Sequence, residues 1–267
     1  MIIVFYTYGG LCNQCYDILY GINFCLANNL QFTFRYASFR NSNLTSWSYV
    51  NFDELFSTDF LQQFQNYTPI SIHNITEENT FNYDGKQRTK YLPHNDNLYD
   101  YLQTINKPYI VLSHFHSYGA GKPIINGINI IDLLKPSNKI YNKYIEIKNK
   151  LFPNNENYNL IHYRYEHDFT NHFHLIVPPL NDIINSIHFK NTNIILYIAS
   201  SNAHIISMNI MNVIYKDENE LIDFNFEQKA YIDFLFGLNS VELYGAINST
   251  FSVLLNRIKK TNNYYAL

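Results

Sequence analysis

The chain has 267 residues, of which 46% are hydrophobic and 15% charged, and a formal net charge of -3, which is typical of a globular protein with a sizeable buried core. It contains no long basic run, which argues against an electrostatic nucleic-acid binder. It also contains no apolar run near the length of about 18 residues that a membrane-spanning helix needs. Met1 leads directly into an apolar strand, so we expect no signal peptide, no membrane span and a cytoplasmic protein.

The first half of the chain opens as a βαβ unit. A short apolar run is broken by Gly9 and Gly10, and apolar residues then recur at helical spacing from Cys15 to Leu26. The elements expected here, in order, are a strand at 2–6, this helix, a strand from 31, polar loop over 37–92 with short helices near 52–56 and 59–65, a strand at 109–115 and a helix over 133–152.

The breaker "PNNEN" after that last helix marks the expected domain boundary, with one domain over 1–155 and a second over 156–267. The second half alternates again, with strands expected at 158–165, 193–200 and 241–245 and helices at 178–187, 203–214, 227–240 and 249–260. Strands that alternate with helices predict an α/β fold with parallel sheets covered on both faces.

In open α/β sheets, ligands bind beyond the carboxyl ends of the strands, and three polar segments fall at such positions. In "YGGLCNQ", Gly9 and Gly10 would let a ligand approach the backbone, and the N-terminus of the following helix favours negative charge. The alternative is a tight turn without a ligand.

The second segment is "NLIHYRYEHDF". Because side chains alternate along a strand, it places His162, Arg164, Glu166 and Asp168 on one face. Arg164 could hold a phosphate through paired charge-assisted hydrogen bonds, with His162 as a further donor. Alternatively, Arg164 pairs internally with Glu166 or Asp168.

The third segment, "YGAINSTFS", ends a strand at Tyr244, turns at Gly245 and begins a helix near Ser249 and Thr250. Hydroxyl groups at this point can cap the helix, or the free N–H groups of its first turn can hold a phosphate. Both interpretations stay open.

Together the three segments resemble the fucosyltransferase-like glycosyltransferases, which include protein O-fucosyltransferases, their plant relatives and α1,2-fucosyltransferases. "GGLCNQ" resembles the GG-x-x-NQ opening of the family, "IHYRYEHDF" its H-x-R strand, and "VELYGAINSTFS" its C-terminal D-x-F-I-G-x-x-S-S-F-S element. Weaker matches at "VLSHFHSYG", "LLKPSNKI" and "ILYIASSN" extend the resemblance over nearly the whole chain. Glu242 departs from the usual Asp of the family, and Cys12 from Gly or Asn.

The resemblance implies a GT-B fold, with two Rossmann-like halves, parallel sheets and a central cleft. The C-terminal half would bind the donor, and the N-terminal half would lie on the acceptor side. The implied reaction is inverting, metal-independent transfer of a deoxysugar, with fucose from GDP-fucose as the first candidate, to a hydroxyl of a glycan or protein. UDP-xylose and UDP-rhamnose are alternative donors, and no cofactor is implied.

Position in the motifs also implies residue roles. Arg164 would hold the donor diphosphate, with support from His162, and Asn13 would face the reacting centre. The other residues implied at the donor site are Gly9, Gly10, Asp168, Glu242, Ser249, Thr250 and Phe251. Catalysis would be electrostatic, since charge develops on the β-phosphate as the sugar leaves. The general base is left open among Asp17, Glu166 and Asp168.

A metal-dependent hydrolase is a competing hypothesis. His167, His172 and His174 cluster beside Asp168 and could bind zinc or another divalent ion, although their spacing matches no standard zinc signature. The lone C-x-x-C of Cys12 and Cys15 is weak evidence for a metal, and together with Cys25 these residues are expected to pack as small apolar side chains.

A third hypothesis is an inactive module that binds a nucleotide sugar on the same fold without turnover. The remaining histidine pair, His114 and His116 in "SHFHS", is expected to pack near the cleft.

Overall fold

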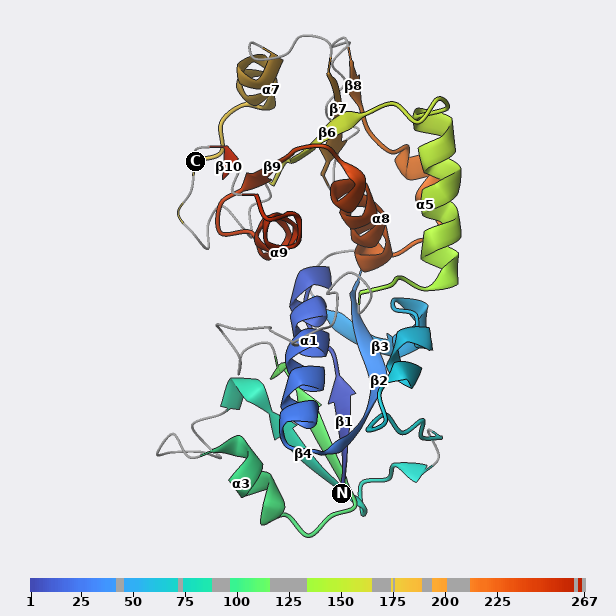
Figure 1. Ribbon diagram of the computed structural model, residues 1–267, viewed down its shortest axis with the longest axis vertical. Coiled ribbons are helices and arrows are strands. Elements are labelled where there is room, and N and C mark those ends of the chain that lie inside the picture. The colour runs from blue at the N-terminus through green and yellow to red at the C-terminus, as the bar shows by residue number, and fades with distance from the viewer. Residues whose placement is uncertain are drawn as a thin grey trace. The chain divides into compact units, whose positions relative to one another are not determined.

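The computed structural model divides the chain into two compact units, Met1–Asn138 and Lys139–Leu267, each with its own five-stranded sheet (Figure 1). The structure describes residues 1–41, 46–71, 74–87, 97–115, 134–164, 174, 176–188, 194–200, 212–261 and 264–265. The α/β fold class expected from the sequence is confirmed.

The division falls at 138/139, whereas the sequence placed the domain boundary at 155/156. The difference is mainly the helix α5 (Asn138–Leu151), which belongs to the second unit from Lys139 onward. Its Tyr144 ring packs edge-on against Phe236, with 4.9 Å between centroids, and Lys139 donates a hydrogen bond to the backbone oxygen of Asp223. The breaker marks the end of α5, and a domain boundary at 155/156 stays a prediction.

The first unit holds a sheet in the order β3-β2-β1-β5-β4. Its elements are β1 (Ile2–Tyr6), α1 (Leu11–Ala27), β2 (Gln31–Arg40), β3 (Trp47–Asn51), the 3-10 helices η1 (Phe52–Glu54) and η2 (Asp59–Gln63), β4 (Thr80–Asp84), η4 (Gly85–Gln87), α3 (Leu98–Gln103) and β5 (Tyr109–Ser113). β1 pairs in parallel with β2 and β5, and β4 with β5.

Two features of this sheet differ from the expectation. β3 pairs with β2 in antiparallel fashion, and the supposed loop over 37–92 contains both β3 and β4. Both lie at sheet edges and carry mixed polar sequences, "WSYVN" and "TFNYD", without the apolar run that identifies a buried strand. Hydrophobic periodicity therefore does not identify edge strands of this kind.

Helix α1 packs across one face of the first sheet (Figure 1). Its Ile18 and Ile22 are fully buried, and Gly21 faces Phe5 of β1, where an added Cβ would lie 2.9 Å from the ring. Phe5 in turn stacks on Phe34 of β2. This packing holds the middle of α1 against β1.

The second unit holds a sheet in the order β10-β9-β6-β7-β8, in which every pairing is parallel. After α5 its elements are β6 (Tyr158–His162), α7 (Leu180–His188), β7 (Ile195–Ala199), β8 (Val213–Ile214), η7 (Glu218–Leu221), α8 (Phe226–Asn239), β9 (Leu243–Ala246), α9 (Thr250–Lys259) and β10 (Tyr264–Tyr265). Residues 213–214, expected to end a helix, form a strand instead; residues 201–211 lie outside the described part.

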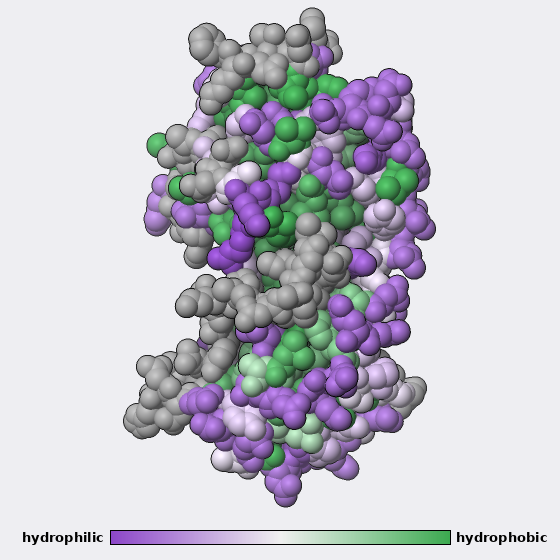
Figure 2. Space-filling model, viewed as in Figure 1, coloured by the Kyte–Doolittle hydropathy of each residue, from purple (hydrophilic) through white to green (hydrophobic). Residues whose placement is uncertain are grey.

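The amphipathic pattern of α5 is confirmed. Its Ile140, Tyr144 and Ile147 are buried, and in Figure 2 the right-hand edge of the second unit, where Figure 1 places α5, is mainly hydrophilic. None of the helices in the described ranges has the length and apolarity that crossing a bilayer requires.

Candidate functional site

The carboxyl ends of β6 and β9 meet at one edge of the second sheet, because the two strands pair in parallel. His162 is the last residue of β6 and is 8% exposed. Its ring stacks on Phe251 of α9, with 4.3 Å between centroids, and its Nδ1 lies 2.7 Å from Oγ of Ser252. The H-x-R segment and the C-terminal motif, 90 residues apart, thus form one cluster.

Ser252 determines which nitrogen of His162 carries the proton. Ser252 is fully buried, and within the described residues its hydroxyl makes its hydrogen bond with His162 alone. A buried hydroxyl proton needs an acceptor, so Ser252 donates to Nδ1 and Nε2 keeps the N–H. Burial, and then the charges of Arg164 and Lys216, lower the pKa of His162 to about 3. His162 is therefore a neutral hydrogen-bond donor at physiological pH.

Gly245 makes this contact possible. A Cβ at this position would lie 2.5 Å from Cβ and 2.6 Å from Oγ of Ser252. Only a residue without a side chain lets the first turn of α9 lie this close to β9. The glycine of the motif is therefore needed for helix packing, and through it for the orientation of His162.

The N-terminus of α9 carries the features of an anion site. Ser249 occupies the N-cap position, but its side chain makes no capping hydrogen bond. Helix capping therefore does not explain the Ser249 hydroxyl. Its Oγ is buried and has no hydrogen-bond partner within the described residues. Thr250, next to it, is exposed. A buried hydroxyl without a partner beside the free N–H groups of a helix N-terminus fits a phosphate oxygen.

Arg164 lies two residues beyond the end of β6 and is half-buried. Glu166 and Asp168, which the sequence places on the same face, lie outside the described residues, so its internal pairing with them stays a prediction. Glu242 lies apart from this cluster: it precedes β9 at the opposite end of the strand, where its carboxylate accepts a hydrogen bond from Asn159.

A buried ion pair lies beneath the same edge and was not identified from the sequence. Lys216, 1% exposed, places its Nζ 2.6 Å from Oδ2 of Asp233 and 3.5 Å from the backbone oxygen of Ser200, the residue after β7. Burial alone would lower the pKa of Lys216, but Asp233 and Glu218 hold it above its ordinary value. Lys216 thus stays charged and ties the ends of β7 and β8 to α8.

In the first unit, Gly9 and Gly10 form the turn between β1 and α1. Gly9 has φ +92°, a conformation that favours glycine. Gln14 holds this turn: its Oε1 accepts hydrogen bonds from Thr7 Oγ1 and Ser38 N, and its Nε2 donates to the backbone oxygens of Gly9 and Ser38, all at 2.8–2.9 Å. The glutamine of the "NQ" motif is therefore a structural residue, a role that sequence reasoning missed.

Asn13 and Asp17 have different environments. Asn13 is half-buried, its amide lies against Gly9, and it makes no side-chain hydrogen bond within the described residues. Asp17 is 1% exposed and accepts the backbone N–H of Tyr8 at 2.8 Å. Asp17 thus holds the turn, and contact of Asn13 with a ligand stays a prediction.

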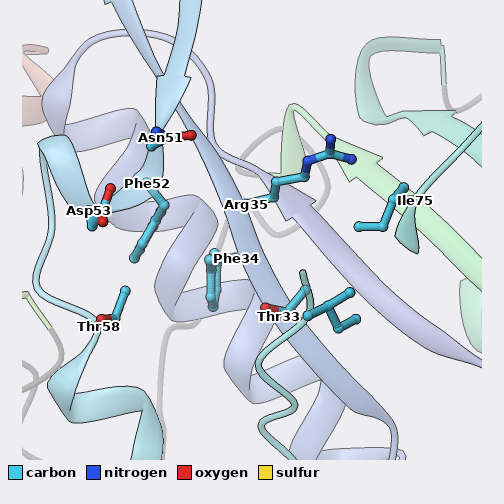
Figure 3. A pocket seen from close by; sticks show the side chains of 9 residues that line it. Thr33, Phe34, Arg35, Asn51, Phe52, Asp53, Thr58 and Ile75 are labelled. Atoms are coloured by element: carbon cyan, nitrogen blue, oxygen red, sulfur yellow. The ribbon is translucent and has the colours of Figure 1, made fainter. Parts of the chain in front are cut away.

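A hollow of about 200 Å³ in the first unit lies away from these residues. Figure 3 shows Phe34, Phe52 and Asp53 around it, in the amino-terminal half of β2 and just after β3. It contains none of the residues expected at the site, and it lies before the carboxyl ends of the parallel strands.

The metal hypothesis receives no support from the described residues, which contain no group of three or more potential His, Cys, Asp or Glu ligands. Two of the three clustered histidines, His167 and His172, lie outside this part of the chain, and His174 lies within it. The three cysteines are free and buried, and burial raises the pKa of Cys15 and Cys25, as expected for apolar packing.

No family model matches the sequence, and no curated protein sequence matches it. Solved structures do. A structure of POFUT1 in complex with GDP matches with a TM-score of 0.66 at 13% identity, covering 100% of this chain and 98% of that one. The fucosyltransferase NodZ from Bradyrhizobium matches with a TM-score of 0.56 at 10% identity, covering 95% and 91%. A mutant of Arabidopsis thaliana FUT1 in complex with GDP matches with a TM-score of 0.55 at 12% identity, covering 98% and 69%.

These matches extend over both units of the chain. At such low identity they establish the fold, and they confirm at that level the resemblance read from the three motifs.

Proposed function

We propose that the protein is a glycosyltransferase that moves a deoxysugar from a nucleotide sugar, with fucose from GDP-fucose as the first candidate, to a hydroxyl of a glycan or protein. Structures of POFUT1 with this fold hold GDP and GDP-fucose. UDP-xylose and UDP-rhamnose remain alternative donors. Transfer with inversion, without a metal and in the cytoplasm is part of the proposal.

The observation that carries the proposal is the cluster at the carboxyl edge of the second sheet. His162 offers a fixed neutral N–H, Arg164 a permanent charge, and the N-terminus of α9 the unpartnered hydroxyl of Ser249. All three are donors suited to a diphosphate. Phe251, stacked on His162, would form the adjoining wall.

The chemistry is electrostatic stabilisation of the leaving group. As the bond from sugar C1 to the β-phosphate oxygen breaks, the electron pair stays on the phosphate, and preorganised donors lower the barrier most where this charge develops. A neutral His162 suits this role, since it needs no proton from solvent at the moment of reaction.

Replacement of Arg164 tests the proposal. We expect Arg164→Ala to lower kcat for GDP release from GDP-fucose roughly 10²- to 10³-fold, the usual loss for one such donor. The kcat of Arg164→Lys should lie between those of wild type and Arg164→Ala, because lysine keeps the charge but cannot form the paired hydrogen bonds. The control is Arg257→Ala, the same change at an exposed position in the last turn of α9. Turnover by folded Arg164→Ala equal to that of the control would refute the role.

An inactive module would bind the donor without releasing GDP, and a metal-dependent hydrolase would lose activity in EDTA. The proposed enzyme would release GDP from GDP-fucose and would keep this activity in EDTA.

A further inference from the structure

Five aromatic side chains gather beside strands β1, β2 and β3 of the first sheet, and none of them is buried. They form a row in which successive ring centroids lie 4.9–6.1 Å apart. Tyr49 of β3 lies in the middle of the row and is 44% exposed. We call this group the aromatic surface; in order along the row, its members are Tyr36, Tyr6, Tyr49, Tyr8 and Trp47.

A β-bulge in β2 turns part of this surface away from the core. Before the bulge, Phe34 pairs with Phe5, and both rings lie on the face of the sheet that α1 covers. The register then shifts, so that Tyr36 pairs with Tyr6. Because side chains alternate along a strand, the extra residue, Arg35, brings Tyr36 to the face opposite α1. Bulges of this kind are frequent next to functional sites, where they redirect a side chain.

The antiparallel pairing of β3 extends the same face to the edge of the sheet. Tyr49 lies opposite Ser38, and Trp47 lies opposite Arg40. Residues directly opposite each other point to the same side of a sheet. The bulge in β2 and the register of β3 therefore place aromatic residues of three neighbouring strands on one side of the first unit.

Three positively charged side chains lie over rings of the aromatic surface, at 4.7–5.3 Å from the cation to the ring centroid. The pairs are Arg35 over Tyr36, Arg40 over Trp47 and Lys86 over Tyr8. Nη1 of Arg35 also donates a hydrogen bond to Oη of Tyr6, at 3.3 Å. Cation–π contacts are attractive, so aromatic carbon and N–H donors are held side by side.

This combination matches the chemistry of a saccharide. One face of a pyranose ring presents C–H groups that pack on the electron-rich face of an aromatic ring, while its hydroxyls accept hydrogen bonds from arginine and lysine. A protein partner fits less well, because the centre of a protein interface is apolar. In the described part of the first unit, the exposed large hydrophobic side chains are Met1 and Tyr49 alone.

We propose that the aromatic surface binds a saccharide. The inference rests on the proposed function in one respect: in a glycosyltransferase this saccharide is the acceptor, which favours a glycan over a protein as the substrate that receives the sugar. All five rings belong to the first unit, so we expect saccharide binding that can be measured without the donor.

Trp47 is the single tryptophan of the chain, so tryptophan fluorescence reports on the aromatic surface directly. In the test, the labelled full chain is applied to an array of glycans that also carries serine- and threonine-containing peptides. The glycan that binds most strongly is then titrated against the unlabelled protein. We expect binding to glycans, with a saturable change in the emission of Trp47.

Substitution of Tyr49 shows whether the rings carry this binding. Tyr49→Ser should weaken glycan affinity roughly tenfold, the usual worth of one aromatic contact, whereas Tyr49→Phe should keep most of the affinity because it keeps the ring. The matched control is Tyr141→Ser on α5 of the second unit, where the tyrosine is 48% exposed. This variant should bind the glycan as wild type does.

Binding to no glycan, binding to the peptides alone, or equal glycan affinity in Tyr49→Ser and Tyr141→Ser would overturn the inference. GDP-fucose binding is measured in parallel by calorimetry. A wild-type protein that binds a glycan through Tyr49 but does not bind GDP-fucose would refute the proposed transfer and leave the saccharide surface standing.

Discussion

His162 is a histidine that stays uncharged at neutral pH, because burial, and then the charges of Arg164 and Lys216, lower its pKa to about 3. The neutral state matters for a donor to phosphate, since its hydrogen bond then does not vary with pH over the physiological range. The same property has a measurable consequence for stability.

We predict that His162 makes the folded state less stable in acid. The unfolded chain takes up a proton near pH 6.5, whereas the folded protein does so only near pH 3. Between these values the unfolded state binds more protons, so stability falls as pH falls, by up to about 1.4 kcal/mol per pH unit. When the unfolding free energy is measured with urea at pH values from 7.5 to 4.5, its dependence on pH should be shallower for His162→Asn than for wild type. Parallel pH profiles for the two proteins would contradict the assignment.

Sequence reasoning could propose site residues that stand in a motif, and this assignment stays a prediction, but it missed the residues whose roles are defined by contacts. His162, Arg164 and Ser249 were expected at a phosphate site from their positions at element ends. Ser252 and Gln14 stand in the quoted motifs, yet their roles depend on partners 90 and 24 residues away. No local pattern encodes such pairs.

At the scale of elements, the proposed donor site depends on how closely α9 approaches β9. Two glycines allow this close packing. A Cβ added at Gly237 of α8 would lie 2.5 Å from Cδ1 of Leu255, and a Cβ added at Gly245 of β9 would lie 2.5 Å from Cβ of Ser252. These two contacts hold α9 against α8 and β9, so packing positions the N-terminus of the helix, where we propose the anion site.

Gly245→Ala should therefore impair both folding and ligand binding. The added methyl group pushes Ser252 and the first turn of α9 outward, which we expect to cost about 1–3 kcal/mol of unfolding free energy, the usual range for overpacking, and to weaken GDP binding at least tenfold.

The matched control is Gly21→Ala, which overpacks Phe5 in the first unit and should lower stability without changing GDP affinity. Denaturant unfolding and calorimetric titration with GDP measure the two effects. Equal GDP affinity in both variants would show that the seating of α9 is irrelevant to the site.

At the scale of the whole molecule, alternating periodicity was sufficient to predict the α/β class, because buried parallel strands and amphipathic helices leave strong local signals. It was insufficient for the polar edge strands β3 and β4, for the antiparallel pairing of β3 and for the strand at 213–214. These are set by neighbouring strands, not by the segment itself.

The three motifs in order indicated the fold that the solved fucosyltransferase structures share with this chain.

The most direct measurement is calorimetric binding of GDP-fucose, UDP-xylose and UDP-rhamnose to the purified protein in EDTA, followed by an assay of nucleotide release. The account predicts saturable binding of GDP-fucose, competition by GDP, and release of GDP without added metal. Absence of binding by all three nucleotide sugars would contradict it.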